Sequence, residues 1–422
     1  MIPLELSRLE QLGRLEVAPW ADAVTGVQID SRRIEEGDLF VAVGPGRDFV
    51  KHAFARGAAA ALLPEDAFAA LAAIGGAVRD RSSARVVGIT GSTGKTSTKD
   101  ILAALCARHA RTVASEASFN NELGVPLTVC RLEPDTEVCI VEMGMRGLGQ
   151  IAELSRIARP DVAVITKVGP VHLELLGTLE NVARSKAEIV DALPPGGIAI
   201  VPDDAPELEP FLRRDEVEVR RFGQPRSWDA DERGARGTFE VGDRTVTVAV
   251  NLAARHQARN VLAALHAADA LGLPLADCEL EVTLSRWRGE EHELAGGGLL
   301  VNDSYNANPL SMRAALEHLA DRAGARRRIA VLGDMAELGP DAPEFHREIG
   351  RAAAELGVAE LVAVGELARG YVEGAEGVPA HWAATAEEAV ELVRTVLRPG
   401  DAVLVKASRA VGLEAVAENL VE

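Results

Sequence analysis

The chain has 422 residues, of which 47% are hydrophobic, and a formal net charge of −19 from 45 basic and 64 acidic residues. This length predicts several domains, each large enough to bury a core of its own. A chain so acidic is poorly suited to coat nucleic acid or to dock on an anionic membrane surface, and we expect neither partner.

The sequence pattern also argues against membrane insertion and secretion. No apolar run reaches the roughly 18 residues that predict a transmembrane helix. The N-terminal segment carries Glu5, Arg8 and Glu10 where a secretory signal would be apolar. The cysteines show neither paired metal spacing nor a dense disulfide pattern, which favours reduced thiols. We therefore expect a cytoplasmic protein.

Residues 1–82 predict a small α/β domain. Residues 37–43 pass from a turn into an apolar run, as a strand would, and residues 52–63 predict a helix that leads into a buried strand. The charged, serine-containing residues 79–85 predict a linker to the next domain.

A regular alternation of strands and helices begins at Arg85, and it predicts a mostly parallel, doubly wound sheet. The strands are expected at 86–90, 138–141 and 161–166, and the helices at 96–110 and 150–157. Residues 203–249 predict irregular, hairpin-like structure. Residues 251–271 predict a long apolar helix, ended by Gly272 and Pro274.

A second α/β series runs to the C-terminus, after a junction expected at Gly296–Gly298. Its strands are expected at 299–301, 328–332, 361–364 and 402–405, with a helix at 311–323. The sequence therefore predicts an α/β protein of three domains, with bounds 1–82, 83–292 and 293–422.

The most specific local signal is a phosphate loop, Gly88-Ile-Thr-Gly-Ser-Thr-Gly-Lys-Thr96, between a predicted strand and a predicted helix. Glycines let backbone N–H groups surround phosphate oxygens, and the helix N-terminus adds partial positive charge. Lys95 would reach the β- and γ-phosphates, and Thr96 would hold Mg²⁺. The longer form of the motif needs glycine at Ile89, so the match is the compact form. It predicts ATP or GTP binding but no particular reaction.

Three further side chains are candidates for the same site. Glu142 ends the strand at 138–141, His172 follows the strand at 161–166, and Lys186 lies on a predicted helix. Ligands bind at the carboxyl ends of strands in open α/β sheets, where Glu142 is placed to hold Mg²⁺. Each also has an ordinary alternative: a solvated carboxylate, a packing histidine and a surface lysine.

Lysine is rare in this chain, since arginine supplies most of the basic charge. The lysine amine is compact and easily modified, so each lysine is a functional candidate beside the alternative of an ordinary surface residue. The lysines are Lys51, Lys95, Lys99, Lys167, Lys186 and Lys406.

Four segments together resemble the Mur ligase family across nearly the whole chain. The second and third are most similar to the branch of the family that adds D-alanyl-D-alanine. The segments are Gly91-Ser-Thr-Gly-Lys-Thr-Ser-Thr-Lys-Asp100, Asn302-Asp-Ser-Tyr-Asn-Ala-Asn-Pro-Leu-Ser-Met312, Leu332-Gly-Asp-Met-Ala-Glu-Leu-Gly339 and Val405-Lys-Ala-Ser-Arg-Ala410. The resemblance implies an N-terminal domain that binds a UDP substrate, a central P-loop ATPase-like domain and a C-terminal Rossmann-like domain.

The resemblance implies a catalytic centre of Lys95, Glu142, His172 and Lys186. Thr96 and Glu142 would hold one Mg²⁺, and His172 with Lys186 a second. Lys186 would be carbamylated, which turns an amine into an oxygen ligand for a hard cation and requires a neutral amine with a lowered pKa. The residues expected to bind the nucleotide are Gly91, Ser92, Thr93, Gly94, Lys95, Thr96, Ser97, Asn260, Arg288, Asp303 and Asn306.

Other matches to the family are looser. Asn260 matches an asparagine near the adenine, although Gln257 replaces its partner asparagine. Ser31 and Arg32 match the uridine-binding part of the N-terminal domain. Lys406 belongs to a C-terminal segment for which we expect a positional role.

The activity implied by the resemblance is an ATP-dependent amide ligase. It would join D-alanyl-D-alanine to UDP-N-acetylmuramoyl-tripeptide through an acyl phosphate, in peptidoglycan precursor synthesis, with both small molecules as partners and the protein a monomer. The alternatives are a sibling ligase that adds a single amino acid, a folylpolyglutamate synthase-like ligase, a nucleotide-binding subunit without catalysis and a small-molecule kinase.

Overall fold

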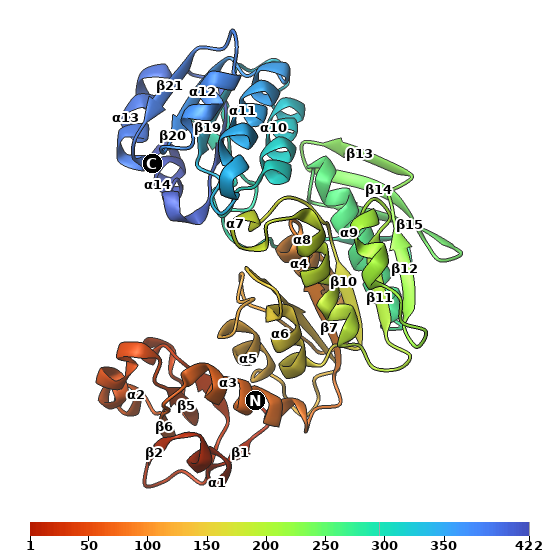
Figure 1. Cartoon of the computed structure of the whole chain (residues 1–422), viewed down its shortest axis with the longest axis vertical. Coiled ribbons are helices and arrows are strands. Elements are labelled where there is room, and N and C mark those ends of the chain that lie inside the picture. Colours follow the sequence, from red (N-terminus) through yellow and green to blue (C-terminus); the bar gives the residue numbers. More distant parts are fainter. Residues whose placement is uncertain (295, 422) are drawn as a thin grey trace.

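A computed structural model describes residues 1–294 and 296–421, which form three bodies arranged as a crescent (Figure 1). The N-terminal body lies at one tip, the C-terminal body at the other, and the central body between them. The α/β class and the three-part organisation predicted from the sequence are confirmed.

The N-terminal body contains a four-stranded sheet of order β2-β6-β5-β4, parallel except for the β2–β6 pair. Its strands are β2 (Arg14–Val17), β4 (Gly26–Gln28), β5 (Asp38–Val41) and β6 (Ala60–Leu63), and its helices are α1 (Leu6–Leu9), α2 (Val50–Ala55) and α3 (Ala67–Arg79). A small ribbon pairs β1 (Leu4–Glu5) with β3 (Ala23–Val24). Helix α3 also packs on the central body, so that one apolar core runs through both.

The central body is built on a six-stranded, fully parallel sheet of order β12-β11-β10-β7-β9-β8. Its strands are β7 (Arg85–Thr90), β8 (Thr112–Ala114), β9 (Val138–Glu142), β10 (Val162–Ile165), β11 (Ile198–Pro202) and β12 (Glu218–Phe222). After β7 the chain forms β8 and β9 on one side of β7, and it then crosses over to form β10, β11 and β12 on the other side. The carboxyl end of β7 is therefore a topological switch point, where ligands bind in such sheets.

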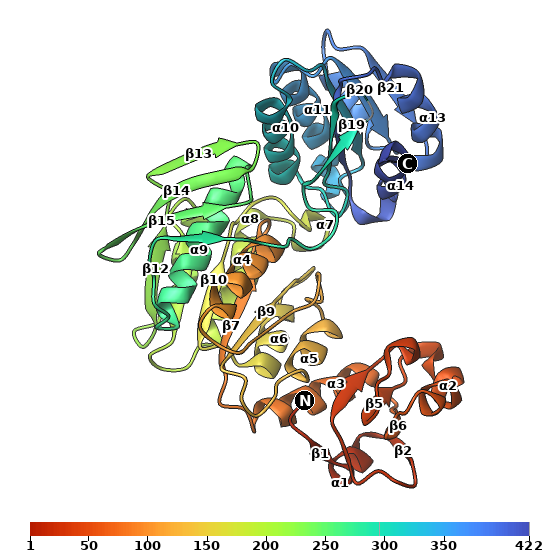
Figure 2. The ribbon, with the colours of Figure 1, turned by 180° about the vertical axis from the view of Figure 1, so that it is seen from behind.

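Helices cover both faces of this sheet, which explains why its strands read as continuous apolar runs. Successive residues of a strand point to opposite faces, so Val86 joins the core shared with α3, while Val87 and Ile89 join the opposite core. In Figure 2, α4 and α9 lie side by side on that second face. The helices are α4 (Lys95–Ala107), α5 (Gly124–Val129), α6 (Gln150–Ala158), α7 (Leu173–Leu176), α8 (Leu179–Asp191) and α9 (Arg255–Ala270).

A second, mostly antiparallel sheet extends the central body, as the hairpin-like pattern of 203–249 predicted. Its strands are β13 (Ser227–Asp231), β14 (Gly234–Val241), β15 (Arg244–Val250) and β16 (Cys278–Leu280). The long helix predicted at 251–271 begins later than expected, because residues 251–254 connect β15 to the start of α9.

The C-terminal body has a sheet of order β17-β18-β22-β19-β20-β21, parallel except for the β17–β18 hairpin. Its strands are β17 (Glu290–Leu294), β18 (Gly298–Asn302), β19 (Arg328–Gly333), β20 (Glu360–Val364), β21 (Ala380–Ala383) and β22 (Ala402–Lys406). Helices α10 (Pro309–Ala323), α11 (Ala342–Glu355) and α12 (Arg369–Gly374) cover one face, and α13 (Ala386–Val396) and α14 (Glu414–Val421) the other.

The junction predicted at Gly296–Gly298 is wrong. Gly296 and Gly297 both have φ of +78° and turn the chain between β17 and β18, so they lie inside the C-terminal sheet. Glycine suits a hairpin turn as well as a linker, which is why the sequence misled. We propose that the third domain begins ahead of Glu290, since β17 crosses the expected boundary.

Within the described residues, no helix combines the length and the apolar character needed to cross a bilayer.

The contact between α11 and α12 gives a stability prediction. A Cβ at Gly350 would lie 2.3 Å from the backbone oxygen of Tyr371, so alanine there would force the two helices apart. Overpacking costs about 1–3 kcal/mol, more than the ~0.5–1 kcal/mol that alanine gains over glycine inside a helix. We expect Gly350→Ala to lower the Tm measured by calorimetry by several degrees.

The matched control is Gly76→Ala in α3, because a Cβ there meets nothing within 4 Å. This control should keep or raise the Tm, since only the helix propensity changes. A Gly350→Ala protein as stable as the control would show that the α11–α12 packing is not as close as described.

Candidate functional site

The phosphate loop lies between β7 and α4, at the switch point of the central sheet. Gly94 has φ of +80°, and a Cβ at Gly91 would lie 1.9 Å from Thr166 Oγ1, so glycine is required at both positions. The loop is held against the segment that follows β10: Ser92 N–H donates to the oxygen of Lys167, at 2.8 Å, and Thr166 Oγ1 donates to the oxygen of Thr93, at 2.5 Å. These contacts hold the loop in a fixed shape.

The first turn of α4 carries the polar groups expected beside a phosphate. Thr96 and Ser97 are buried, and Lys95 Nζ donates to the oxygen of Gly91 at 2.8 Å. Burial lowers the pKa of Lys95; the charge of Glu142 opposes this shift, and that of Arg288 adds to it. The Lys95 ammonium therefore lies among charged groups that come from β9 and from the segment before β17.

Glu142 ends β9 with its carboxylate fully buried, so the solvated-carboxylate alternative is wrong. Its Oε1 accepts a hydrogen bond of 2.7 Å from Asn120 Nδ2, and its N–H donates to Ser115 Oγ at 3.1 Å. Its Oε2 is buried and has no hydrogen-bond partner. Because an unpartnered buried carboxylate oxygen is costly, this atom is placed to bind a cation.

His172 and Lys186 come to the same edge from β10 and α8. The ring of His172 is half-buried, and its Nδ1 contacts Glu337 Oε2 of the C-terminal body. Burial lowers the pKa of His172 against the opposing effect of Glu337. Lys186 is only 2% exposed, so the surface-lysine alternative is also wrong. Burial and then the like charge of Lys95 set the pKa of Lys186 well below its usual value.

The four expected catalytic side chains are therefore gathered in one region. Glu142 acts on the pKa of Lys95, Lys95 on that of Lys186, and both lysines on that of His172. Charges influence one another in this way only over short distances or through poorly screened interiors. Lys95, Glu142, His172 and Lys186 therefore lie in one part of the central body.

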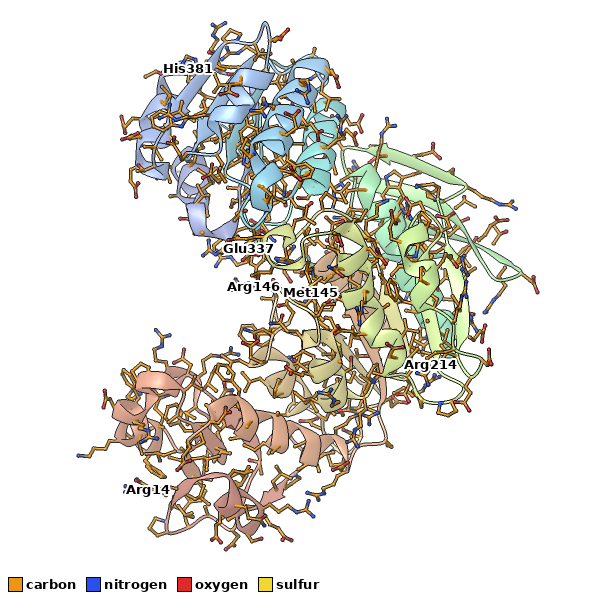
Figure 3. All side chains as sticks on the ribbon, viewed as in Figure 1. Arg14, Met145, Arg146, Arg214, Glu337 and His381 are labelled. Atoms are coloured by element: carbon orange, nitrogen blue, oxygen red, sulfur yellow. The ribbon has the colours of Figure 1, made fainter. Side chains whose placement is uncertain are left out.

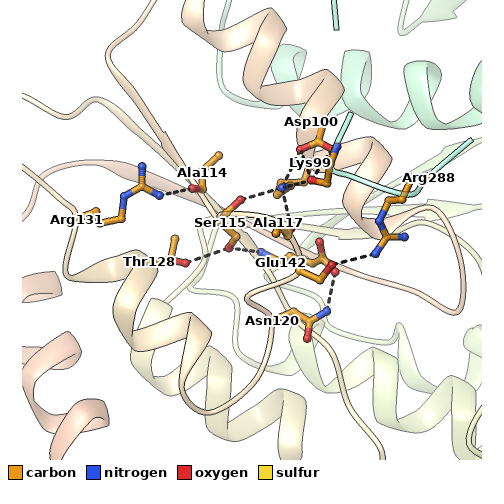
Figure 4. A network of polar contacts seen from close by, with 12 residues as sticks. Lys99, Asp100, Ala114, Ser115, Ala117, Asn120, Thr128, Arg131, Glu142 and Arg288 are labelled. Carbon is orange, nitrogen blue, oxygen red and sulfur yellow. Dashed lines mark hydrogen bonds and ion pairs between the residues drawn. The ribbon is translucent and has the colours of Figure 1, made fainter. Parts of the chain in front are cut away.

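A buried network around the 115–120 loop supports Glu142 (Figure 4). Lys99 Nζ donates to the oxygens of Ser115, at 2.8 Å, and Ala117, at 3.0 Å, and pairs with Asp100 at 2.8 Å. Asp100 in turn accepts from Ser285 N–H, at 2.9 Å, in the segment that leads to the C-terminal body. Lys99 therefore fixes the loop that presents its polar side chains to Glu142.

Arg288 links the same loop to the C-terminal body. Its Nη2 donates to Ser118 Oγ at 3.0 Å, and its guanidinium lies 4.2 Å from the ring centroid of Tyr305. Its Nε is buried and has no hydrogen-bond partner. A buried guanidinium with a donor to spare fits an anionic ligand such as a phosphate.

Asn260 lies on α9 against the phosphate loop. Its Oδ1 would be 2.4 Å from a Cβ at Gly94, and its Nδ2 donates to Gln257 Oε1 at 2.8 Å. The glutamine that replaces the expected asparagine therefore holds Asn260 in place.

Two nucleotide candidates from the C-terminal body are engaged elsewhere. Asp303 pairs with the buried Lys406 at 2.6 Å, and Lys406 also donates to the oxygen of Asn306 at 2.8 Å. Asn306 Oδ1 accepts from Ala307 N–H. The residue that reaches the phosphate loop is instead Asn308, whose Nδ2 lies 3.5 Å from the oxygen of Ser92.

Ser31 and Arg32 lie in the N-terminal body, which is separate from the phosphate-loop region (Figure 1). Ser31 is buried, with its Oγ 2.9 Å from His52 Nδ1, and the guanidinium of Arg32 pairs with Asp30. The neighbouring Arg33 pairs at 2.8 Å with Glu116 of the 115–120 loop.

Sequence reasoning named Lys99 only as one of the rare lysines, and it missed Asn120, Glu337 and Asn308. The rarity of lysine was the signal for Lys99, and no predicted element pointed to Asn120. Nothing local to the sequence indicated that Glu337 meets His172, because the contact joins residues far apart in the chain.

The donors gathered here fit a divalent cation beside phosphate. They are the free Glu142 Oε2, the Thr96 hydroxyl, the His172 ring and the Lys186 amine, which would need modification to supply oxygen. Within residues 1–294 and 296–421, no group of three or more His, Cys, Asp and Glu side chains is arranged to hold a metal ion.

Comparison with known proteins agrees with this geometry. The Mur ligase middle domain matches residues 89–268, and the Mur ligase, glutamate ligase domain matches residues 287–409. The UDP-N-acetylmuramoyl-tripeptide--D-alanyl-D-alanine ligase of Mycobacterium bovis is 37% identical, over 94% of this chain and 92% of that protein.

Solved structures are similar over the whole molecule. MurF from Acinetobacter baumannii has a TM-score of 0.86 at 28% identity, and the match covers 99% of this chain and 99% of that one. The MurF ligase from Thermotoga maritima in complex with ADP has a TM-score of 0.79 at 29% identity, over 94% of this chain and 97% of that one.

The buried Lys99–Asp100 pair gives a second prediction. Removing one partner of a buried ion pair costs about 3–5 kcal/mol, because the other charge is left uncompensated. We expect Lys99→Met to lower the Tm and to weaken ATP binding by about tenfold, a 1.4 kcal/mol effect, as the 115–120 loop loosens. Calorimetric titration and thermal unfolding measure the two effects.

Two further proteins make this test specific. Lys51→Met removes an exposed lysine and should change neither quantity. Lys99→Met with Asp100→Asn should recover part of the stability, because the uncompensated carboxylate is gone, but not the affinity for ATP. If Lys99→Met behaves like Lys51→Met, the network does not support the site.

Proposed function

The chain belongs to the Mur ligase family, and we propose that it is an ATP-dependent ligase that joins D-alanyl-D-alanine to UDP-N-acetylmuramoyl-tripeptide in peptidoglycan precursor synthesis. The relative of that name matches nearly the full length of both chains. The proposal is supported by the phosphate loop between β7 and α4 and by the buried, unpartnered Oε2 of Glu142 at the end of the neighbouring strand β9.

The first step activates the tripeptide carboxylate. One of its oxygens forms a bond to the γ-phosphorus of ATP, the bond from that phosphorus to the β–γ bridging oxygen breaks, and ADP leaves. The N–H groups of residues 91–97 and the ammonium of Lys95 would bind the phosphates, and Asn260 would lie near the adenine. Arg288 adds positive charge beside them. Fixed charges of this kind stabilise the transferring phosphoryl group.

The second step forms the amide. The amine nitrogen of D-alanyl-D-alanine attacks the carbonyl carbon of the acyl phosphate, the bond to the phosphate oxygen breaks, and the nitrogen loses its proton. Water would destroy the acyl phosphate, so the site must exclude it. Contacts such as Asn308 with Ser92 support a site closed between the central and C-terminal bodies, with Asp303 and Asn306 on its C-terminal side.

Mg²⁺, when bound, would neutralise charge so that the γ-phosphate and the peptide carboxylate can approach each other. Thr96 and Glu142 would hold one ion, and the free Oε2 of Glu142 supports this assignment. His172 and a carbamylated Lys186 would hold the other.

Carbamylation needs only carbon dioxide. The Lys186 nitrogen forms a bond to the carbon of CO₂ and loses a proton, which leaves a carbamate with two oxygens. Burial and the neighbouring charge of Lys95 favour the neutral amine that this reaction requires. A bare ammonium is costly to bury without a partner. A carbamate can instead be neutralised in the same place by a hard cation bound to its oxygens.

The roles proposed for the N-terminal body are those that the Mur ligase family implies. Ser31 and Arg32 of the N-terminal body would bind the uridine part of the substrate. One chain carries all of these groups, so the protein would act as a monomer in the cytoplasm, where ATP is present.

The alternatives are less well supported. A kinase would leave the C-terminal body without a role. A subunit without catalysis would have no reason to bury Lys186 and an unpartnered Glu142 oxygen, both of which are costly. A sibling ligase or a folylpolyglutamate synthase-like enzyme would use the same phosphate-loop chemistry, so only the acceptor separates them.

The deciding experiment measures phosphate release and product mass with ATP, Mg²⁺ and UDP-N-acetylmuramoyl-tripeptide. The tripeptide is supplied with either diaminopimelate or lysine as its third residue. D-Alanyl-D-alanine, D-alanine or no acceptor is then added. We expect turnover only when D-alanyl-D-alanine is the acceptor, with one phosphate released for each amide bond formed.

Lys95→Ala should lower the rate by about 10²–10³-fold, since it removes one fixed donor to the transferring group. Equal turnover with D-alanine would identify a sibling ligase. Phosphate release that ignores the acceptor would rule out coupled ligation.

A further inference from the structure

One side chain near the proposed cation site comes from a different body of the protein. Glu337 lies in the 333–338 loop that follows β19, and it meets His172 and Arg146 of the central body. Figure 3 shows Glu337 and Arg146 close together on the concave side of the crescent. The roles assigned above give Glu337 nothing to do.

The 333–338 loop is held firmly by buried side chains. Tyr371 OH donates to the oxygen of Gly333 at 2.9 Å, and Ser408 Oγ accepts from Ala336 N–H at 2.9 Å. The fully buried His346 accepts from Met335 N–H through Nε2, at 3.0 Å, because its Nδ1 hydrogen is given to a backbone oxygen. The loop is therefore a rigid support rather than a free surface turn.

This support presents Glu337 in an unusual backbone conformation. Glu337 has φ of +62° and His172 has φ of +52°, both in the left-handed region that side chains other than glycine rarely adopt. A half-exposed ion pair contributes little stability, too little to offset two such residues. Strain of this kind is concentrated at functional sites, which favours a role for the contact beyond holding the bodies together.

The contact also determines which ring nitrogen of His172 is free. Glu337 Oε2 meets Nδ1, and a carboxylate can only accept, so the ring hydrogen lies on Nδ1. The lone pair of Nε2 is then available to a cation. Arg146 Nε lies 3.3 Å from Glu337 Oε1 and helps to orient the carboxylate. Metal-binding histidines commonly donate their second nitrogen to a carboxylate in this way.

We infer that Glu337 is a positioning residue for the cation site: it orients His172 so that Nε2 faces the ion. The inference rests on the proposed role of His172 as a cation ligand. It adds that one ligand of the central body is held in its binding geometry by the C-terminal body. Cation affinity therefore depends on how the C-terminal body is docked, in addition to the ligands themselves.

The test measures binding of Mn²⁺, as a paramagnetic substitute for Mg²⁺, in the presence of ADP and bicarbonate by electron paramagnetic resonance. Loss of an outer carboxylate partner commonly weakens metal binding by about 10–100-fold. We expect Glu337→Ala to weaken one class of Mn²⁺ site by that factor. Glu337→Gln should retain more of the affinity, because its amide oxygen still accepts from Nδ1. Glu348→Ala, an exposed glutamate on α11, should change nothing.

A second readout needs neither metal nor turnover. The ¹⁵N spectrum of the His172 ring in the metal-free protein, assigned by comparison with His172→Gln, reports which nitrogen carries the hydrogen. The wild-type protein and Glu337→Gln should show hydrogen on Nδ1, and Glu337→Ala should show a mixture of both forms. A changed ring signal with unchanged Mn²⁺ affinity would show that the contact sets the tautomer without positioning a cation ligand, and it would overturn the inference.

The outcomes separate the inference from the function on which it rests. If His172→Gln weakens Mn²⁺ binding but Glu337→Ala changes neither the affinity nor the ring spectrum, the inference is overturned and the proposed function stands. If His172→Gln itself leaves Mn²⁺ binding intact, His172 is not a ligand, and both the inference and that part of the proposed mechanism are overturned.

Discussion

Burial of charge at the carboxyl edge of the central sheet is the constraint on which the site depends. Lys99, Glu142 and Lys186 are buried there, beside the partly buried Lys95, and an uncompensated charge in a protein interior is costly. Lys99 is satisfied by Asp100 and by backbone oxygens. Glu142 keeps one free oxygen, and Lys186 is pushed toward its neutral form. Each buried charge is therefore either paired within the protein or left ready for a ligand.

The 115–120 loop connects this buried site to the other bodies of the molecule. It contacts the N-terminal body through Glu116, the segment before β17 through Ser118, and Glu142 through Asn120. In the described residues, five non-glycine positions have positive φ. Ala117 lies in this loop, Trp287 precedes the Arg288 that contacts it, and His172 and Glu337 form the contact between the central and C-terminal bodies. The strained positions thus mark the place where the bodies meet, as expected where geometry serves a ligand rather than stability.

Features set by local pattern were predictable from the sequence, and features set by the docking of distant segments were not. The strand before Gly91, the buried strand ending at Glu142 and the helix carrying Lys186 follow from periodicity and glycine placement. The contacts of Lys99 with Ser285 and of His172 with Glu337 join residues far apart in the chain, so no local pattern encodes them. The sequence indicated Asn306 rather than Asn308, although Asn308 is the residue that contacts Ser92. Which of two neighbouring asparagines reaches the phosphate loop depends on how the C-terminal body docks, and no local pattern encodes that.

The central claim is that one pocket binds ATP and two cations beside the tripeptide carboxylate. A crystal structure with a non-hydrolysable ATP analogue, Mg²⁺, bicarbonate and UDP-N-acetylmuramoyl-tripeptide tests it most directly. The account predicts the γ-phosphate between Lys95 and Arg288, one ion bound to Glu142 Oε2, and a Lys186 side chain extended by a carboxyl group that shares a second ion with His172. A nucleotide bound away from residues 91–97, or an unmodified Lys186 with no ion near it, would contradict the account.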